Sequence, residues 1–112
     1  MTENTPLSTP LGTFEEQVML AVLRTAGDAY AMAVRRELEH VTRRTIAIGS
    51  IYVTLDRLES KALIASTRTS SDASSSRRVF AVTPLGAHAL SATRAMRERL
   101  WDGVELRALL RT

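Results

Sequence analysis

The sequence predicts a mainly α-helical protein that carries one small β-hairpin. Apolar residues recur at helical spacing through most of the 112 residues, and aromatic residues, which favour strands, make up only 4%. The pattern changes only after the middle of the chain, where two short segments of mixed alternation flank a serine-rich stretch. A chain of this length is expected to form one compact domain, so these elements must share a single core.

The first segments are a polar arm and two helices. Residues 1–10 contain two prolines and no periodicity, which predicts a mobile N-terminal arm. Thr13 and Glu16 have the spacing of a capping box, with Thr13 as the N-cap of a helix that ends at Gly27. Asp28 should cap a second helix over residues 29–41. Its inward positions are expected to be Tyr30, Val34, Leu38 and Val41, with Arg35, Arg36, Glu37 and Glu39 solvated.

Residues 49–62 predict a helix with two different faces, because one stripe is apolar and another, roughly a quarter turn away, is polar and basic. The apolar stripe contains Ile51, Leu55, Leu58 and Ala62, and the polar stripe contains Ser50, Thr54, Arg57 and Lys61. Hydroxyls and cations beside a packed stripe are typical of a recognition helix in a DNA major groove. The alternative is an ordinary surface helix with a solvated polar side.

Two strands and a long helix are expected to follow. Residues 63–69 and 77–83 predict strands joined by the polar stretch 70–76, although a flexible linker is the alternative. Thr83 and Pro84 predict the start of a helix that runs to about residue 110. A helix of that length exceeds what so small a domain can cover, so part of its apolar stripe should need a second chain. The expected dimer interface contains Met96, Leu100, Trp101 and Val104.

Positive charge is concentrated around the candidate recognition helix. Residues 43–78 contain seven basic residues against three acidic ones, whereas the remainder has eight against nine. This distribution indicates a surface that binds a polyanion. Fourteen of the fifteen cations are arginine, which suits bidentate contacts to phosphate or guanine but can also reflect genomic composition.

The sequence also argues against several classes of function. It has no cysteine, and its two histidines, His40 and His88, are far apart, so we expect no metal site and no cofactor. The longest apolar run, residues 18–23, is far below the ~18 residues of a membrane span, and no signal pattern precedes it, so a cytoplasmic protein without a membrane partner is expected. Enzymatic activity is not expected, because paired carboxylates, a glycine-rich phosphate loop and a nucleophile set are all missing.

The predicted order is helix, helix, recognition helix, two-stranded wing and long helix, which is the order of a winged helix-turn-helix. Four segments, which together extend from residue 11 to about residue 86, make this order more specific. One of them is the pattern Gly-x-Ile-Tyr-x-x-Leu-x-Arg-Leu-Glu at residues 49–59, and the others are Leu11-Gly12-Thr13-Phe14-Glu15, Ala29-Tyr30-Ala31, and residues 77–83 with Pro84 and Gly86. These segments resemble the PadR family of bacterial transcriptional regulators, and the pattern at residues 49–59 is the most specific part of the resemblance.

The resemblance implies three parts: the arm at 1–10, a winged helix-turn-helix DNA-binding domain at 11–83, and a C-terminal dimerisation helix at 84–112, as in the short PadR subgroup. It implies a homodimeric repressor that binds double-stranded DNA and is often released from it by a small-molecule effector. Two-fold symmetry of the dimer then makes the operator a pseudo-palindrome. Family members usually have glycine at the positions of Ala31 and Ala62. The turn after the recognition helix is therefore expected to be built differently here.

The candidate DNA contacts are the residues that place small polar or basic groups on or beside the recognition helix. They are Arg43, Arg44, Gly49, Ser50, Tyr52, Thr54, Arg57, Lys61, Arg77 and Arg78. Alternatives remain for some of them: Tyr52 could be a half-buried packing residue, and Arg57 could pair with a local acid. Side chains alternate along a strand, so only one of Arg77 and Arg78 should face DNA unless the wing twists sharply.

Two further alternatives concern partners. Trp101 is expected to pack in the dimer interface, but across a dimer axis it could also form a wall of a pocket for an aromatic or hydrophobic effector. The rival function is a winged-helix module that binds another protein and uses its basic surface only incidentally. Loss of binding to every DNA duplex at low salt would favour that rival.

Overall fold

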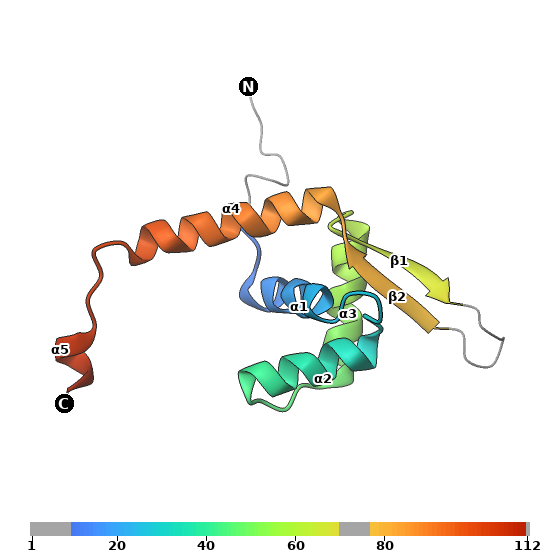
Figure 1. Cartoon of the computed structure of the whole chain (residues 1–112), viewed down its shortest axis with the longest axis horizontal. Coiled ribbons are helices and arrows are strands. Elements are labelled where there is room, and N and C mark those ends of the chain that lie inside the picture. The colour runs from blue at the N-terminus through green and yellow to red at the C-terminus, as the bar shows by residue number, and fades with distance from the viewer. Residues whose placement is uncertain (1–9, 70–76, 112) are drawn as a thin grey trace, which may run out of the picture.

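The computed structural model describes residues 10–69 and 77–111, so the predicted arm up to residue 9 and the predicted hairpin tip at 70–76 lie outside the described residues. The mainly α fold with one antiparallel hairpin is confirmed (Figure 1). The elements are α1 (Thr13–Arg24), α2 (Ala31–Thr42), α3 (Ile48–Ser60), β1 (Ile64–Thr69), β2 (Arg77–Val82), α4 (Pro84–Trp101) and α5 (Arg107–Leu110).

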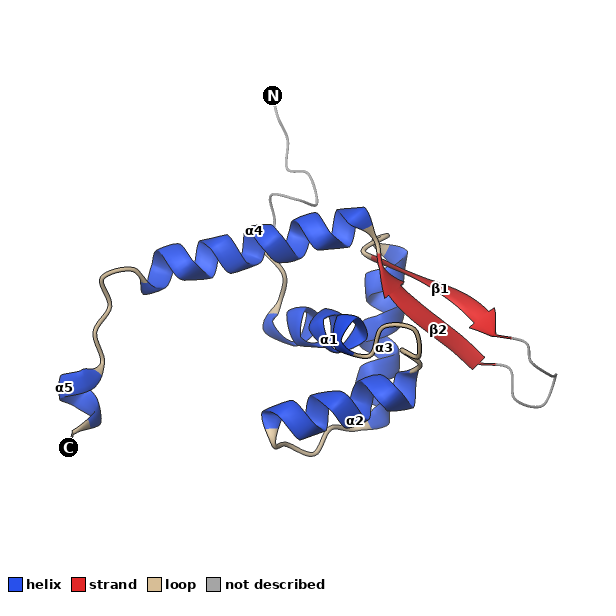
Figure 2. Cartoon of the chain, viewed as in Figure 1, coloured by secondary structure: helices blue, strands red, loops and turns tan. Residues whose placement is uncertain are grey.

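The core forms where α1, α2 and α3 meet beneath the base of the hairpin (Figure 2). Ile51, Leu55 and Leu58 of α3 are fully buried, which confirms three of the four residues in the predicted apolar stripe. Val18, Met19 and Val22 from α1 are also buried, at 1% exposure or less. Burial of this stripe fixes the rotation of α3 about its own axis.

The hairpin pairs β1 with β2 in antiparallel register from Ile64 opposite Val82 to Thr69 opposite Arg77. Its base is held at two further points. The Phe80 amide donates to the Ala29 carbonyl at 2.9 Å, and the Thr83 amide donates to the Leu63 carbonyl at 3.1 Å. The hairpin is therefore attached both to the segment before α2 and to the turn after α3, and it meets our expectation of a wing.

Several predicted helix ends are wrong by one or two residues. The N-cap of α1 is Gly12, whose amide donates to Glu15 Oε1 at 3.0 Å, so Thr13 is the first helical residue and not the cap. Glu16 instead forms an ion pair with Arg97 of α4. Helix α2 begins at Ala31, after Tyr30 rather than after Asp28. Thr, Asp and Gly all suit an N-cap, so the sequence alone did not decide between them.

The turn after α3 contradicts the expectation that alanine would change it. Ala62 adopts a left-handed backbone with φ of 62°, the conformation that glycine favours. The Leu63 amide donates to the Leu58 carbonyl at 3.0 Å and closes the turn. Placing an alanine here costs about 1 kcal/mol in backbone strain, which the buried residues on either side of the turn offset.

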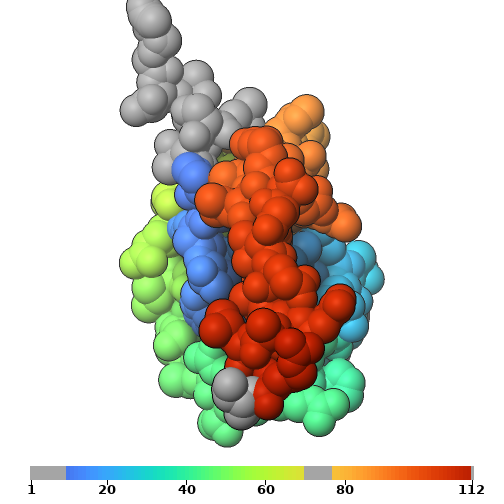
Figure 3. All heavy atoms as spheres, turned by 90° about the vertical axis from the view of Figure 1, so that its left-hand side faces the viewer, coloured from blue at the N-terminus to red at the C-terminus, as the bar shows by residue number. Residues whose placement is uncertain are grey.

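The terminal helix is shorter than predicted. It is capped by Thr83, whose Oγ1 accepts from the Gly86 amide at 3.0 Å, but α4 ends at Trp101, and Gly103 follows with φ of 79°. Every residue from 97 to 111 is exposed. Helix α4 runs beyond the helical domain on the side away from the wing, and α5 lies at its far end (Figure 1). Figure 3 views the molecule from that side, with this C-terminal segment in front.

We predict that Gly86→Ala destabilises the fold by about 2 kcal/mol or more. A Cβ at Gly86 would lie 2.0 Å from the Leu63 carbonyl oxygen and 3.0 Å from Met19 Cε, so the start of α4 would have to shift. Urea denaturation measures the loss. Gly49→Ala is the control, because no atom lies within 4 Å of its added Cβ. Equal stability of the two variants would contradict the close packing of α4 on the turn before β1.

Candidate functional site

The outer face of α3 is the surface opposite the buried stripe. Gly49, Val53, Asp56 and Ser60 follow one another at spacings of four, three and four residues, which places them along one ridge. All four are exposed, and Val53 retains 55% of its accessible surface. Ser50 and Arg57 are exposed on one flank of the ridge, and Tyr52 is exposed on the other. This ridge is the part of α3 that a ligand can approach most closely.

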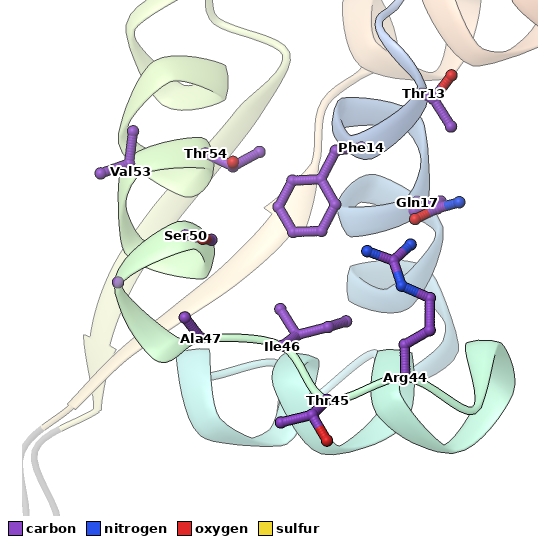
Figure 4. Close-up of a pocket in the computed structure, with 11 residues that line it drawn as sticks. Thr13, Phe14, Gln17, Arg44, Thr45, Ile46, Ala47, Ser50, Val53 and Thr54 are labelled. Carbon is purple, nitrogen blue, oxygen red and sulfur yellow. The ribbon is translucent and has the colours of Figure 1, made fainter.

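The predicted DNA contact through Thr54 is wrong. Its side chain is 5% exposed and points from α3 toward Phe14 of α1, whereas Val53 points away from that contact (Figure 4). Position 54 lies about 60° around the helix from Ile51, close enough to the core for α1 to cover it. The sequence pattern did not show that α1 packs against this flank of α3. The exposed outer ridge of α3 therefore contains Val53 and Asp56, which the sequence analysis did not select.

An open groove of about 800 Å³ lies along the first flank, between α3, the start of α1 and the turn after α2 (Figure 4). Ser50, Val53 and Arg44 contribute to its lining. Arg43 and Arg44 are both exposed in the turn, and neither has an ion-pair partner in the described part of the chain. This flank therefore presents two uncompensated positive charges beside α3.

Two charged residues of α2 hold that turn in place. Arg35 Nε donates to the Ile46 carbonyl at 2.8 Å, and the Ile46 amide donates to Glu39 Oε2 at 2.8 Å. Glu37 is also engaged, since it accepts from Arg24 of α1 at 2.6 Å. The prediction that these side chains are merely solvated is therefore wrong. Their partners are distant in sequence or belong to the backbone, so helical spacing alone could not identify them.

The other flank of α3 faces the wing across a second cavity of about 360 Å³. Tyr52 of α3, Tyr30 at the start of α2, and Arg68 and Arg77 of the wing are part of its lining. The Arg77 guanidinium carbon lies 3.8 Å from the centroid of the Tyr30 ring. Arg36 Nη2 donates to the Tyr30 hydroxyl at 2.7 Å, and this bond, opposed in part by burial and assisted by Arg77, holds the pKa of Tyr30 below its ordinary value.

Arg78 fastens the wing to α3. It forms an ion pair with Glu59, a longer one of 3.4 Å with Asp56, and its guanidinium carbon lies 4.8 Å from the Phe80 ring centroid. Glu59 Oε2 also accepts from the Ser66 hydroxyl at 2.7 Å. The Ser66 hydrogen bond is the main cause of a lowered pKa for Glu59; burial opposes it and Arg78 adds to it. Arg78 and Arg77 thus have different contacts, in agreement with their alternation along β2.

Lys61, another predicted DNA contact, pairs with Glu15 of α1 at 2.8 Å. Burial raises the pKa of Glu15, but the hydrogen bonds from Lys61 and the Gly12 amide outweigh it, so the net shift is downward. Lys61 therefore joins the end of α3 to α1. Arg57 forms no ion pair among the described residues, and only its more distant charge acts on Glu15, so the alternative of a direct pair with a local acid finds no support.

Arg68 is a candidate that the sequence analysis missed. It is exposed on β1 directly opposite Arg78, and it has no ion-pair partner within the described ranges. Like charges directly opposite each other in a hairpin are destabilising. The Glu59 and Asp56 carboxylates pair with Arg78 and leave the charge of Arg68 without a direct partner. The strand register depends on how the hairpin closes, and the composition of residues 70–76 does not specify that register.

The far end of α4 and the segment after it expose apolar side chains. Leu100 is 69% exposed, Trp101 58% and Val104 51%, while Met96 is half-buried. Leu20 and Leu23 of α1 are also exposed, at 42% and 48%. Within residues 10–69 and 77–111 there is no cluster of three potential metal ligands and no helix long and apolar enough to cross a membrane.

Comparison with known proteins gives one family. The model of the transcriptional regulator PadR-like family matches residues 19–92. A PadR family transcriptional regulator from Eggerthella lenta DSM 2243 is 28% identical, with a TM-score of 0.64 over 85% of this chain and 81% of that one. A PadR-like transcription factor from Bacteroides fragilis is 25% identical, with a TM-score of 0.71 over 81% and 85%. No curated protein matches the chain.

We predict that Glu59→Gln destabilises the protein by about 1 to 2 kcal/mol at pH 7, because it removes the charge that Arg78 and Ser66 bind. The pKa of Glu59 is lowered in the fold, so its contribution is complete above the ordinary value of 4.5 and is lost as the pH falls through the lowered value. The difference from the parent should therefore shrink in acid. Denaturant titrations at several pH values measure it.

The matched control is Glu105→Gln, whose ion pair with Arg107 is largely exposed, with 63% and 80% of the two side chains accessible. It should leave stability nearly unchanged. A Glu59→Gln protein as stable as this control at pH 7 would show that the wing does not depend on the Glu59 carboxylate.

Proposed function

The chain belongs to the PadR-like family of transcriptional regulators, and from this premise we propose that it is a sequence-specific regulator that binds double-stranded DNA as a homodimer. Members of this family are transcription factors and not enzymes. One observation carries the proposal most directly: the outer ridge of α3 is exposed and is flanked on both sides by arginines without acidic partners in the described residues. A B-DNA major groove is about 12 Å wide and admits one helix between two phosphate backbones.

In this proposal α3 enters the major groove along its outer ridge. Gly49 and Ser50 are small, so the start of the helix can approach the base edges closely. Arg57 supplies donors for a base or a phosphate. Arg43 and Arg44 contact one backbone, while Tyr52 and Arg77 contact the other, because the two sets lie on opposite flanks of α3. Lys61 and Arg78 support the site through their ion pairs.

The homodimer rests on the exposed end of α4. Leu100 and Trp101 in the last turn of α4, together with Val104 beyond its end, make up an apolar surface that a single chain leaves in water. A second copy could cover it with Met96 at the edge of the contact, and two α3 helices would then read a pseudo-palindromic operator. We further propose that the protein acts as a repressor and that a small aromatic or hydrophobic effector relieves the repression. Trp101 would form one wall of the effector pocket. The proposed location is the cytoplasm.

The second candidate function is a winged-helix module that binds protein. The mixed character of the ridge, with an apolar Val53 and an acidic Asp56, is the observation in its favour. Selection of bound duplexes from a random pool at low salt separates the two. Enrichment of one sequence supports the DNA-binding regulator, and failure to retain any duplex supports the protein-binding module.

We predict that Arg57→Ala weakens binding to the selected operator by about 1 to 3 kcal/mol and changes the ranking of operator variants. Arg77→Ala should instead weaken binding to all duplexes alike and reduce the salt dependence of the affinity, because a phosphate contact carries no base information. Fluorescence titrations at several salt concentrations measure both effects. Arg111→Ala is the control, since it removes an exposed arginine at the opposite end of the chain. An unchanged ranking with Arg57→Ala would exclude this residue from base recognition.

We predict that Leu100→Asp combined with Trp101→Ala produces monomers. Each large side chain that a partner fully covers contributes about 1.5 to 3 kcal/mol, and an aspartate in that contact would be desolvated without a partner. Light scattering measures the oligomeric state, and operator titration should show weak, salt-sensitive binding without preference for the full palindrome. Ala92→Asp places the same charge on an exposed position of α4 within the domain and should leave the dimer intact. A persistent dimer in the double variant would move the interface elsewhere.

A further inference from the structure

We propose that the cavity between the start of α2, α3 and the wing is a phosphate site, which we call the wing pocket, and that Tyr30 is its positioning residue. The proposal rests on the proposed DNA-binding function and assigns to this pocket one backbone phosphate of the bound duplex. The wing pocket is defined by Tyr30, Tyr52, Arg68 and Arg77, together with Arg36, which reaches the Tyr30 hydroxyl. Of these residues, sequence reasoning had selected only Tyr52 and Arg77.

The first argument is charge balance. Arg78 also lines this cavity, but it is compensated by Glu59 and Asp56. Arg36, Arg68 and Arg77 have no carboxylate within ion-pair distance in the described residues. Arg68 and Arg77 line the cavity, and Arg36 bonds to Tyr30 in its wall. These uncompensated guanidinium groups repel one another, and an anion in the cavity would offset that repulsion. The cavity of about 360 Å³ is large enough for a phosphate group.

The second argument is the way Tyr30 holds two of these arginines. Its ring faces the Arg77 guanidinium at 3.8 Å, and its hydroxyl oxygen accepts from Arg36 Nη2 at 2.7 Å. An acceptor bond to Arg36 leaves the phenolic proton available to donate to another oxygen. Tyr30 is itself fixed, because it precedes the first residue of α2 and the neighbouring Ala29 carbonyl accepts from Phe80 of β2 at 2.9 Å.

The third argument is the type of donor. Guanidinium groups offer parallel N–H donors that match the oxygens of a phosphate, and phenol hydroxyls add single donors. The groups come from α2, α3 and both wing strands, so the pocket exists only when the wing is docked. A phosphate bound here would lie on the flank of α3 opposite Arg43 and Arg44. That arrangement matches two backbones on either side of a helix in the major groove.

The test is a scan of the operator with single methylphosphonate linkages, each of which removes the charge of one phosphate. We expect one linkage per half-site at which the parent protein loses roughly tenfold in affinity. The variants Arg68→Ala and Tyr30→Leu should bind the unmodified operator more weakly than the parent does. A methylphosphonate at the critical linkage should then weaken their binding little further. Tyr30→Phe, which keeps the ring against Arg77 but lacks the hydroxyl, should give an intermediate result. A change in folding alone would not select one linkage.

Two controls make the outcomes distinct. Arg111→Ala should keep the full effect of the critical linkage, and thermal denaturation should confirm that each variant folds. If the losses from Arg68→Ala and from the methylphosphonate simply add at every linkage, the wing pocket does not bind a backbone phosphate and the proposal is overturned. If no duplex is retained even at low salt, the proposed DNA-binding function itself fails.

A second arm identifies the source of the phosphate. Pyrophosphate is added to the parent and to Arg68→Ala during thermal denaturation without DNA. A DNA-backbone site should give only weak stabilisation at millimolar pyrophosphate. The opposite result has two parts: micromolar pyrophosphate stabilises the parent saturably but not Arg68→Ala, and the losses in the linkage scan are additive. That result would overturn the backbone assignment and assign the pocket to a free ligand that carries phosphate.

Discussion

The rest of the structure depends on the burial of one stripe of α3. Ile51, Leu55 and Leu58 are fully removed from water against α1 and α2, and each contributes about 1.5 to 3 kcal/mol. A rotation of α3 by one residue would expose this stripe and bury polar side chains instead. Because that exchange is so unfavourable, the same contacts that stabilise the core also determine which residues face outward. The position of the exposed outer ridge of α3 is thus a consequence of hydrophobic packing.

The wing takes its position from α3 through a short series of polar contacts. Glu59 lies in the last turn of α3, where it binds Arg78 of β2 and Ser66 of β1. Ala62 then turns the chain into β1 at the expense of a left-handed backbone. The hydrogen bond from Phe80 to Ala29 joins β2 to the start of α2, so Tyr30 and Arg77 are brought together. The flank of α3 that faces the wing is therefore positioned by the same buried stripe.

Residues whose environment is set by local periodicity could be predicted from the sequence, and residues whose environment is set by distant partners could not. The buried stripe of α3, the cap at Thr83 and the hairpin follow from spacing and from turn chemistry within a few residues. Thr54 was misplaced because α1, which is distant in sequence, covers it. Arg68 was missed because its position opposite Arg78 depends on the strand register. The break after Trp101 was not predicted, because the apolar spacing continues past Gly103, where the backbone is left-handed.

Charge pairing explains why the positive surface is stronger than the composition suggests. In the described chain, acidic side chains pair with Arg24, Arg35, Lys61, Arg78 and Arg97, contacts that hold the elements of the fold in place. Eight described arginines have no such partner, namely Arg36, Arg43, Arg44, Arg57, Arg68, Arg77, Arg99 and Arg111. Six of them lie on or beside α3, and two lie at the opposite end of the chain. Acids used for structure cannot also neutralise these six charges, so folding itself separates a positively charged surface around α3 from the exposed apolar residues at the end of α4.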